Sequence, residues 1–156
     1  MLKIKYPFKK FYLYILVLFQ IFNFAIVEAK KTIDFTAVLA PGYKLLTTGY
    51  SQEAAAAFAK KTKKYPDSAA CHIALGKAYK VLGKISLAKN EFKTATFVQS
   101  NYAEGYLELA KLQESDQEWN LAIQSFQEYA KLDPDEANRQ GINDRIKFCQ
   151  EKSASR

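Results

Sequence analysis

The sequence has few of the residues that most often carry chemistry. Among 156 residues there are one histidine, two cysteines, one methionine and one tryptophan. The histidine, His72, directly follows Cys71, and consecutive side chains on a helix point about 100° apart, so the two cannot act as base and nucleophile. No His or Cys spacing fits a metal site, and no glycine-rich loop fits a phosphate. We therefore predict a protein that is not an enzyme and has no cofactor.

A strong excess of one charge is also absent once the N-terminus is set aside. The whole chain has a formal net charge of +7, but residues 1–29 hold four lysines and one glutamate, which leaves +4 for residues 30–156. A balance this small does not indicate a protein that binds nucleic acid. We expect a protein or peptide segment as the partner.

One long hydrophobic run is present, and it lies near the N-terminus. Residues 11–27 are nearly all apolar and follow a head with four lysines. Val27-Glu28-Ala29 offers small residues at the spacing that a signal peptidase reads, so we interpret residues 1–29 as a secretory signal cleaved after Ala29. The run is slightly shorter than the ~20 residues that span a bilayer comfortably, and an uncleaved anchor is the alternative.

Both interpretations of residues 1–29 place the rest of the chain outside the cytoplasm, because the N-terminal lysines stay inside. We expect a periplasmic or secreted protein. If the segment stays uncleaved, the chain is anchored in the inner membrane and touches the membrane only through residues 11–27.

The remaining sequence repeats with a period of 34 residues. Four sets of positions share this spacing: Pro66, Ser100 and Pro134; Ala54, Ala88 and Ala122; Phe58, Phe92 and Phe126; and the small residues Gly42, Gly76 and Ala110. Agreement in four registers at once indicates a true repeat, and repeats of this length stack into arrays.

The middle copy carries the clearest motif. Its residues reproduce the spacing W-x2-L-G-x2-Y, with histidine in place of tryptophan, and small and aromatic residues follow at the expected positions: His72, Leu75, Gly76, Tyr79, Ala88, Phe92 and Ala95. The chain thus resembles the tetratricopeptide repeat (TPR) family. The resemblance implies an all-α, right-handed α-solenoid with three tandem repeats in residues 35–134, bounded as 35–68, 69–102 and 103–136.

Hydrophobic spacing predicts the same helices independently. In the middle copy, apolar residues recur at steps of three and four over residues 69–82 and again from Ile85 to near Phe97, and Gly83 separates the two helices. Small residues at Gly76 and Ala88 let the two backbones approach, and we expect Phe92 to fill the space between them.

The two ends depart from the repeat pattern. Pro41 lacks an N–H and fits best in a first turn, so we predict a short first helix over residues 41–48 behind an irregular segment over residues 30–40; a separate short element within residues 32–40 is the alternative. At the other end, we predict one capping helix over residues 137–152, within a terminal segment of residues 135–156. Gly141 is the point at which that helix would bend or break.

The two cysteines fall in different parts of this array. Cys71 lies near the start of the middle copy and Cys149 lies late in the capping helix, whereas a disulfide needs Cα atoms within about 7 Å. We favour two separate buried thiols, and one disulfide is the alternative.

In TPR arrays the first helix of each pair lines the concave surface, and the resemblance implies a peptide-binding groove there. The expected groove residues are Leu39, Tyr43, Leu46, Ile73, Lys77, Lys80, Glu104, Leu107, Lys111 and Glu114. The apolar members would hold a peptide and the lysines would reach acidic groups. The resemblance does not extend to the carboxylate clamp of chaperone-binding members, because Leu39 and Tyr43 stand where the clamp needs Lys and Asn.

Two functional classes follow from the sequence. The first is an exported interaction module or scaffold that binds a segment of another cell-envelope protein. The second is a membrane-tethered assembly factor whose uncleaved N-terminal helix is part of the working protein. For any single groove residue, a solvated surface position is the alternative to partner contact.

Overall fold

The computed structural model describes residues 33–155. The predicted secretory signal and its cleavage site lie outside the described residues. From Phe35 onward the chain forms one compact unit, and all regular structure described in it is α-helical. Among the described residues, no helix is long and apolar enough to cross a membrane.

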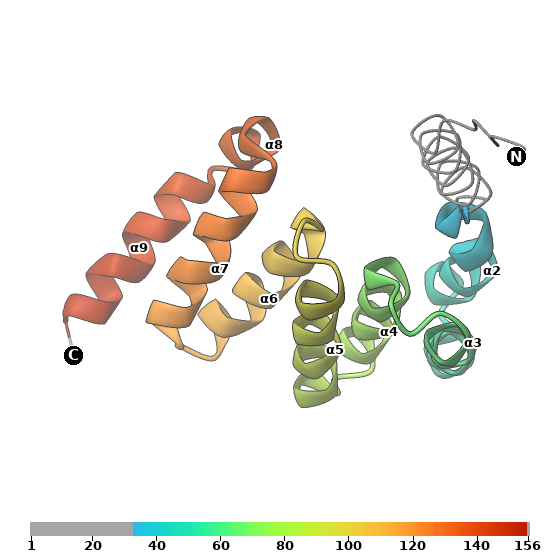
Figure 1. The fold of residues 1–156 in the computed structure, drawn as a ribbon. Coiled ribbons are helices and arrows are strands. Elements are labelled where there is room, and N and C mark those ends of the chain that lie inside the picture. Colours follow the sequence, from blue (N-terminus) through green and yellow to red (C-terminus); the bar gives the residue numbers. More distant parts are fainter. Residues whose placement is uncertain (1–32, 156) are drawn as a thin grey trace, which may run out of the picture. The chain divides into compact units, whose positions relative to one another are not determined.

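The helices follow one another with short turns between them (Figure 1). They are α2 (Phe35–Thr47), α3 (Ser51–Lys64), α4 (Ala69–Val81), α5 (Ile85–Val98), α6 (Ala103–Ser115), α7 (Trp119–Leu132), α8 (Pro134–Arg139) and α9 (Ile142–Ala154). The two helices predicted for the middle copy are confirmed as α4 and α5, each to within a residue or so of the predicted ends.

The helices pack in pairs. Helix α2 packs on α3, α4 on α5, and α6 on α7, and successive pairs are joined by contacts of α3 with α4 and of α5 with α6. The first helices of the pairs also contact each other, α2 with α4 and α4 with α6. The result is a helical solenoid of three pairs, followed by α8 and α9, which both pack on α7.

One phenylalanine per pair anchors the core. Phe58, Phe92 and Phe126 are 1 %, 0 % and 0 % exposed, and each belongs to a different one of the three core clusters. A Cβ atom at Gly76 would lie 2.5 Å from Cε1 of Phe92, which confirms that the ring fills the space beside the glycine. All three clusters are drawn from residues 39–149, so the unit carries its own hydrophobic core.

The first helix is longer than predicted. Helix α2 begins at Phe35 and runs through Pro41, so the prediction of an irregular segment was wrong for residues 35–40. Pro41 inside a helix costs about 3 kcal/mol. The burial of Phe35 and Leu39, which precede Pro41 in the helix, offsets that cost. Leu39 is 4 % exposed, and the Phe35 ring packs edge-on against Tyr65 with centroids 5.4 Å apart.

The predicted capping helix is divided in two at Gly141. Helix α8 ends before Gly141, whose φ of 62° lies in the left-handed region, and α9 begins directly after it. Asp133 caps α8 by accepting a hydrogen bond from the Glu136 amide at 3.2 Å. The break lets Ile142 and Cys149 become fully buried in the third cluster with Phe126.

Candidate functional site

The first helices of the three pairs, α2, α4 and α6, share one side of the array, which we refer to as the inner face. These helices contact one another in series, so side chains on their shared side form one continuous surface. Four residues at the same repeat position run along it with a spacing of 34: Tyr43, Lys77, Lys111 and Arg145. The last of these comes from α9, so the terminal helix extends the inner face beyond the third pair.

A cleft opens in this face at its α2 end. It is lined by Phe35, Thr36, Leu39 and Tyr43 of α2, Ala70 of α4, and Tyr102 and Glu104 at the start of α6, and its volume is about 210 Å³. Small-molecule sites usually measure ~300 Å³ or more, so this cleft suits one large side chain of a partner. Three aromatic rings and one carboxylate line it.

The structure divides the ten predicted groove residues into core and surface. Leu39, Ile73 and Leu107 are buried in the core clusters and offer a partner almost no surface. Tyr43 and Leu46 are half-buried against the first cluster, and the Tyr43 ring packs against Phe58 at 5.1 Å between centroids. The five charged members remain half-exposed on the inner face: Lys77, Lys80, Glu104, Lys111 and Glu114.

Each of these charged groups pairs with an opposite charge inside the molecule. Lys77 of α4 binds Glu104 of α6, and Lys80 binds Glu108 one turn further along α6. Lys111 lies 3.5 Å from the other oxygen of Glu108. Glu114 binds Arg145 of α9. The inner face therefore presents charges that are already balanced, and they link α4, α6 and α9.

The pKa directions agree with these pairs. Burial would lower the pKa of Lys77, but the hydrogen bond and the charge of Glu104 outweigh it and raise the pKa above its ordinary value. Burial would raise the pKa of Glu108, yet the hydrogen bond from Lys80 and the nearby lysine charges hold it below its ordinary value. Both groups are thus charged at neutral pH.

Sequence reasoning missed Glu108 and Arg145. Glu108 is 7 % exposed and forms the centre of a network with two lysines. Arg145 binds Glu114 and lies over the Phe126 ring, 4.8 Å from its centroid. The signal for Arg145 was present, because it follows Lys111 by one repeat period.

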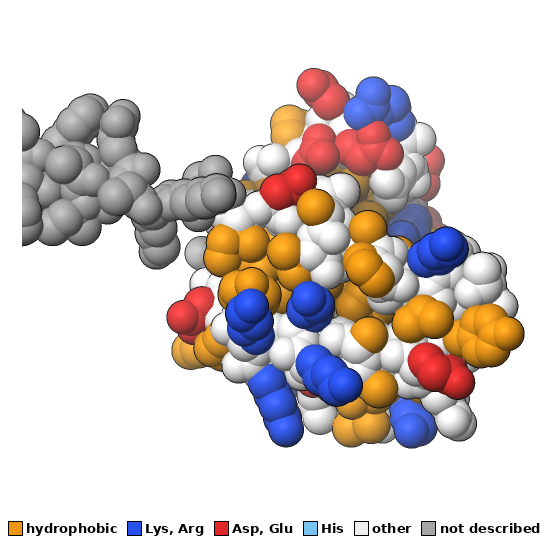
Figure 2. Space-filling model, turned by 90° about the vertical axis from the view of Figure 1, so that its right-hand side faces the viewer, with side chains coloured by type: hydrophobic (Ala, Val, Ile, Leu, Met, Phe, Trp, Pro, Cys, Tyr) orange, Lys and Arg blue, Asp and Glu red, His pale blue; other side chains and the backbone are white. Residues whose placement is uncertain are grey.

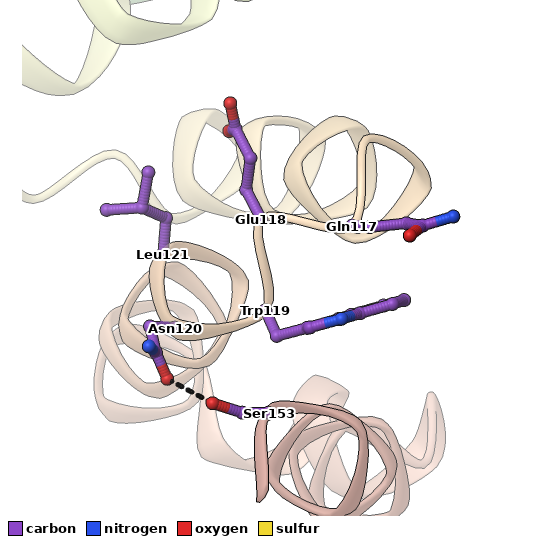
Figure 3. A pocket seen from close by; sticks show the side chains of 6 residues that line it. All are labelled: Gln117, Glu118, Trp119, Asn120, Leu121 and Ser153. Atoms are coloured by element: carbon purple, nitrogen blue, oxygen red, sulfur yellow. Dashed lines mark hydrogen bonds between the residues drawn. The ribbon is translucent and has the colours of Figure 1, made fainter. Parts of the chain in front are cut away.

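A second hollow lies between the α6–α7 turn and the end of α9 (Figure 3). It is lined by Gln117, Glu118, Trp119, Asn120, Leu121 and Ser153, with a volume of about 390 Å³. Ser153 donates a hydrogen bond to Asn120 at 2.7 Å, and the Trp119 ring packs edge-on against Phe148. The one carboxylate here, Glu118, binds Lys89 at 2.6 Å, so no charged group is left to act on a ligand.

His72 and the two cysteines are engaged in hydrogen bonds and in the core. His72 contacts Glu91 at 2.7 Å and the Pro66 carbonyl at 2.9 Å, and both of its ring nitrogens are used. Cys71 is fully buried in the first cluster, and burial raises its thiol pKa. Cys71 and Cys149 are free thiols in different clusters. Among residues 33–155, no three His, Cys, Asp or Glu side chains are grouped to hold a metal ion.

No protein-family model matches this sequence, and no curated protein matches it. Solved structures do match, and three of them, each at 19 % identity or less, are described below. The first TPR domain of the human RPAP3 protein matches with a TM-score of 0.64 and 19 % identity, over 76 % of this chain and 91 % of that one.

Two bacterial structures match over more of the chain. The type III secretion translocator chaperone SycD of Yersinia enterocolitica has a TM-score of 0.68 and 12 % identity, over 83 % of this chain and 93 % of that one. A type III secretion complex from Aeromonas hydrophila has a TM-score of 0.71 and 15 % identity, over 85 % and 91 %. Identities this low establish a shared fold and leave the function to be argued from the site.

Proposed function

From the TPR fold of its described residues, we propose that this chain is an exported interaction module that binds a segment of another cell-envelope protein on its inner face. The observation that carries the proposal is the aromatic cleft between α2, α4 and α6, bordered by the Lys77–Glu104 pair. We assign the chain no catalytic role and no cofactor.

Proteins of the same fold support a peptide or protein as the partner. The first TPR of Spaghetti (RPAP3) was solved with the HSP90 peptide SRMEEVD, and TPR2B of yeast Sti1 with an Hsp70 peptide complex. SycD is a chaperone of a secretion translocator. Peptide binding to this chain would differ in chemistry from binding by a carboxylate clamp, since Leu39 and Tyr43 cannot hold a carboxylate as Lys and Asn do.

The balanced charges of the inner face define the partner further. Because Lys77, Lys80 and Lys111 already contact carboxylates, a purely acidic segment would have to displace those pairs. An amphipathic segment fits better: one large apolar side chain in the cleft, with polar groups that hydrogen-bond to the rims of the ion pairs.

Export is the second part of the proposal and rests on residues 1–29. The alternative function, a membrane-tethered assembly factor, requires that residues 11–27 remain attached and in the membrane. The intact mass of the protein recovered from cells distinguishes the two, because a cleaved chain begins at Lys30.

A charge swap tests the inner face. The double variant Lys77→Glu, Glu104→Lys keeps the ion pair but exchanges the positions of its two charges. Its free energy of unfolding should therefore fall by less than about 1 kcal/mol. A partner oriented by these two charges should be recovered about tenfold less after crosslinking in the native envelope, a loss of ~1.4 kcal/mol.

The matched control is Lys131→Glu with Glu128→Lys, which reverses an exposed pair within α7. Partner recovery should be unchanged in this control. If the α7 swap lowers recovery as much as the inner-face swap does, the inner face is not the binding site.

A further inference from the structure

The outer side of α3 ends in a cluster of lysines. Lys60, Lys63 and Lys64 are exposed and lie on the side of the helix opposite Phe58, because residues three and four apart share a face. We refer to these three residues as the lysine cluster. Figure 2 shows the α2–α3 end of the molecule, where basic side chains gather in the lower half of the view beside hydrophobic ones, while acidic side chains gather mainly above.

The three amines of the lysine cluster share one helix face and form no ion pair with any described residue. Lys77, Lys80 and Lys89 each bind carboxylates of the following pair, but among residues 33–155 no carboxylate lies within ion-pair distance of the three cluster amines. Lys64 instead lies over the Tyr65 ring, 5.3 Å from its centroid. The helix dipole favours lysines in a last turn but does not require them, since α5 and α6 end without any basic residue.

The cluster lies at the end of the unit where the chain arrives from its N-terminal segment. The ring contact of Phe35 with Tyr65 holds the start of α2 against the end of α3. Residues 11–27, the apolar run, end eight residues before Phe35, and a fully extended chain of that length spans at most about 28 Å. A membrane that holds or has just released this run is therefore within reach of the cluster.

We propose that the lysine cluster, with Tyr65 beneath it, docks on the surface of an anionic phospholipid bilayer. A broad surface of phosphate groups matches three amines that spread over an exposed helix face, and lysine beside tyrosine is a combination typical of the membrane interface. Near an anionic membrane each lysine contributes about fivefold to binding.

The test uses residues 30–156, which contain the complete core, and measures co-sedimentation with vesicles. Vesicles of phosphatidylcholine with about 30 % phosphatidylglycerol should bind this chain at least tenfold better than pure phosphatidylcholine vesicles, and the difference should shrink as salt is added. The variant Lys60→Gln, Lys63→Gln, Lys64→Gln should lose at least about tenfold of the binding to the anionic vesicles.

The matched control is Lys84→Gln, Lys93→Gln, Lys147→Gln, which removes the same charge from three other exposed lysines and should bind nearly as the unmodified chain does. Thermal unfolding of both variants checks that they are folded.

An equal loss of vesicle binding in the two variants overturns the proposal, because the reduced net charge alone would explain it. Failure of the unmodified chain to bind anionic vesicles overturns it as well. Cluster-dependent binding to polyglutamate without binding to vesicles would assign the cluster to an acidic protein instead. None of these outcomes bears on the inner face, so the proposed function stands or falls separately.

Discussion

At the scale of single residues, the three buried phenylalanines determine how the pairs hold together. Phe92 is completely buried beside Gly76 at the centre of the array. Phe92→Ala should lower the free energy of unfolding by about 3 to 5 kcal/mol, because truncation of a buried aromatic leaves a cavity. Denaturant unfolding measures this loss. Lys93→Ala, next in sequence but exposed, is the control and should change stability by less than about 0.5 kcal/mol; equal losses in the two variants would mean that the repeat register is wrong.

His72 makes the stability of the protein depend on pH, and its contacts fix the sign of that dependence. Its two ring nitrogens face the Glu91 carboxylate and the Pro66 carbonyl, which are both acceptors, so both bonds form only when the ring is protonated. The hydrogen bond that His72 donates to Glu91, opposed in part by burial, raises the pKa of His72 above its ordinary value, and the nearby charge of Asp67 acts in the same direction.

A raised pKa means that the contribution of His72 to stability is fully present below about pH 6.5 and is lost as the pH rises through the folded-state value. The melting temperature of the unmodified chain should therefore exceed that of His72→Gln by more at pH 5.5 than at pH 8.5. A difference that stays constant between these two pH values would contradict a protonated His72.

The residues of the inner face show where prediction from sequence ends. The helix register predicts one shared side of the first helices for Lys77, Lys80 and Lys111, because helical periodicity fixes the direction of side chains. It did not separate Leu39, Ile73 and Leu107, which are buried, from their half-exposed neighbours, since the boundary between core and groove depends on how closely adjacent pairs pack. The pairing of Lys80 with Glu108 depends on the offset between α4 and α6, which only the tertiary structure sets.

At the scale of elements, the middle pair was the most predictable and the ends the least. Helices α4 and α5 have regular stripes, a serine cap and Gly83 between them, so local and tertiary preferences agree. At Pro41 they conflict, and the packing of Phe35 and Leu39 in the first core cluster overrides the preference of proline for a first turn. At Gly141 the sequence predicts a bend or a break, and the structure has a break, which allows Ile142 to be buried.

The N-terminal segment provides a prediction at the same scale. If Val27-Glu28-Ala29 is a cleavage site, Ala29→Leu should block a small-residue subsite and leave a longer species in the membrane fraction. Intact mass and N-terminal sequencing of the chain from cells measure this. The unmodified chain should begin at Lys30; recovery of a membrane-bound chain that still begins at Met1 would favour the anchored alternative.

At the scale of the whole unit, the paired charges join neighbouring helix pairs into one surface. Lys77 and Lys80 connect α4 to α6, Lys89 connects α5 to the α6–α7 turn, and Glu114 connects α6 to α9. Each pair of helices buries its remaining apolar surface only against its neighbours, as expected for a repeat array. A partner that lies along the inner face would contact side chains from several pairs at once.

Site-specific photocrosslinking tests directly whether a partner binds on the inner face. A photoreactive phenylalanine analogue at Tyr102, which lines the cleft, and the same analogue at Gln127, exposed on α7, would be compared in cells. Binding on the inner face should give one discrete crosslinked protein from position 102 and none from position 127. A crosslinked partner from position 127 with none from position 102 would contradict binding on the inner face.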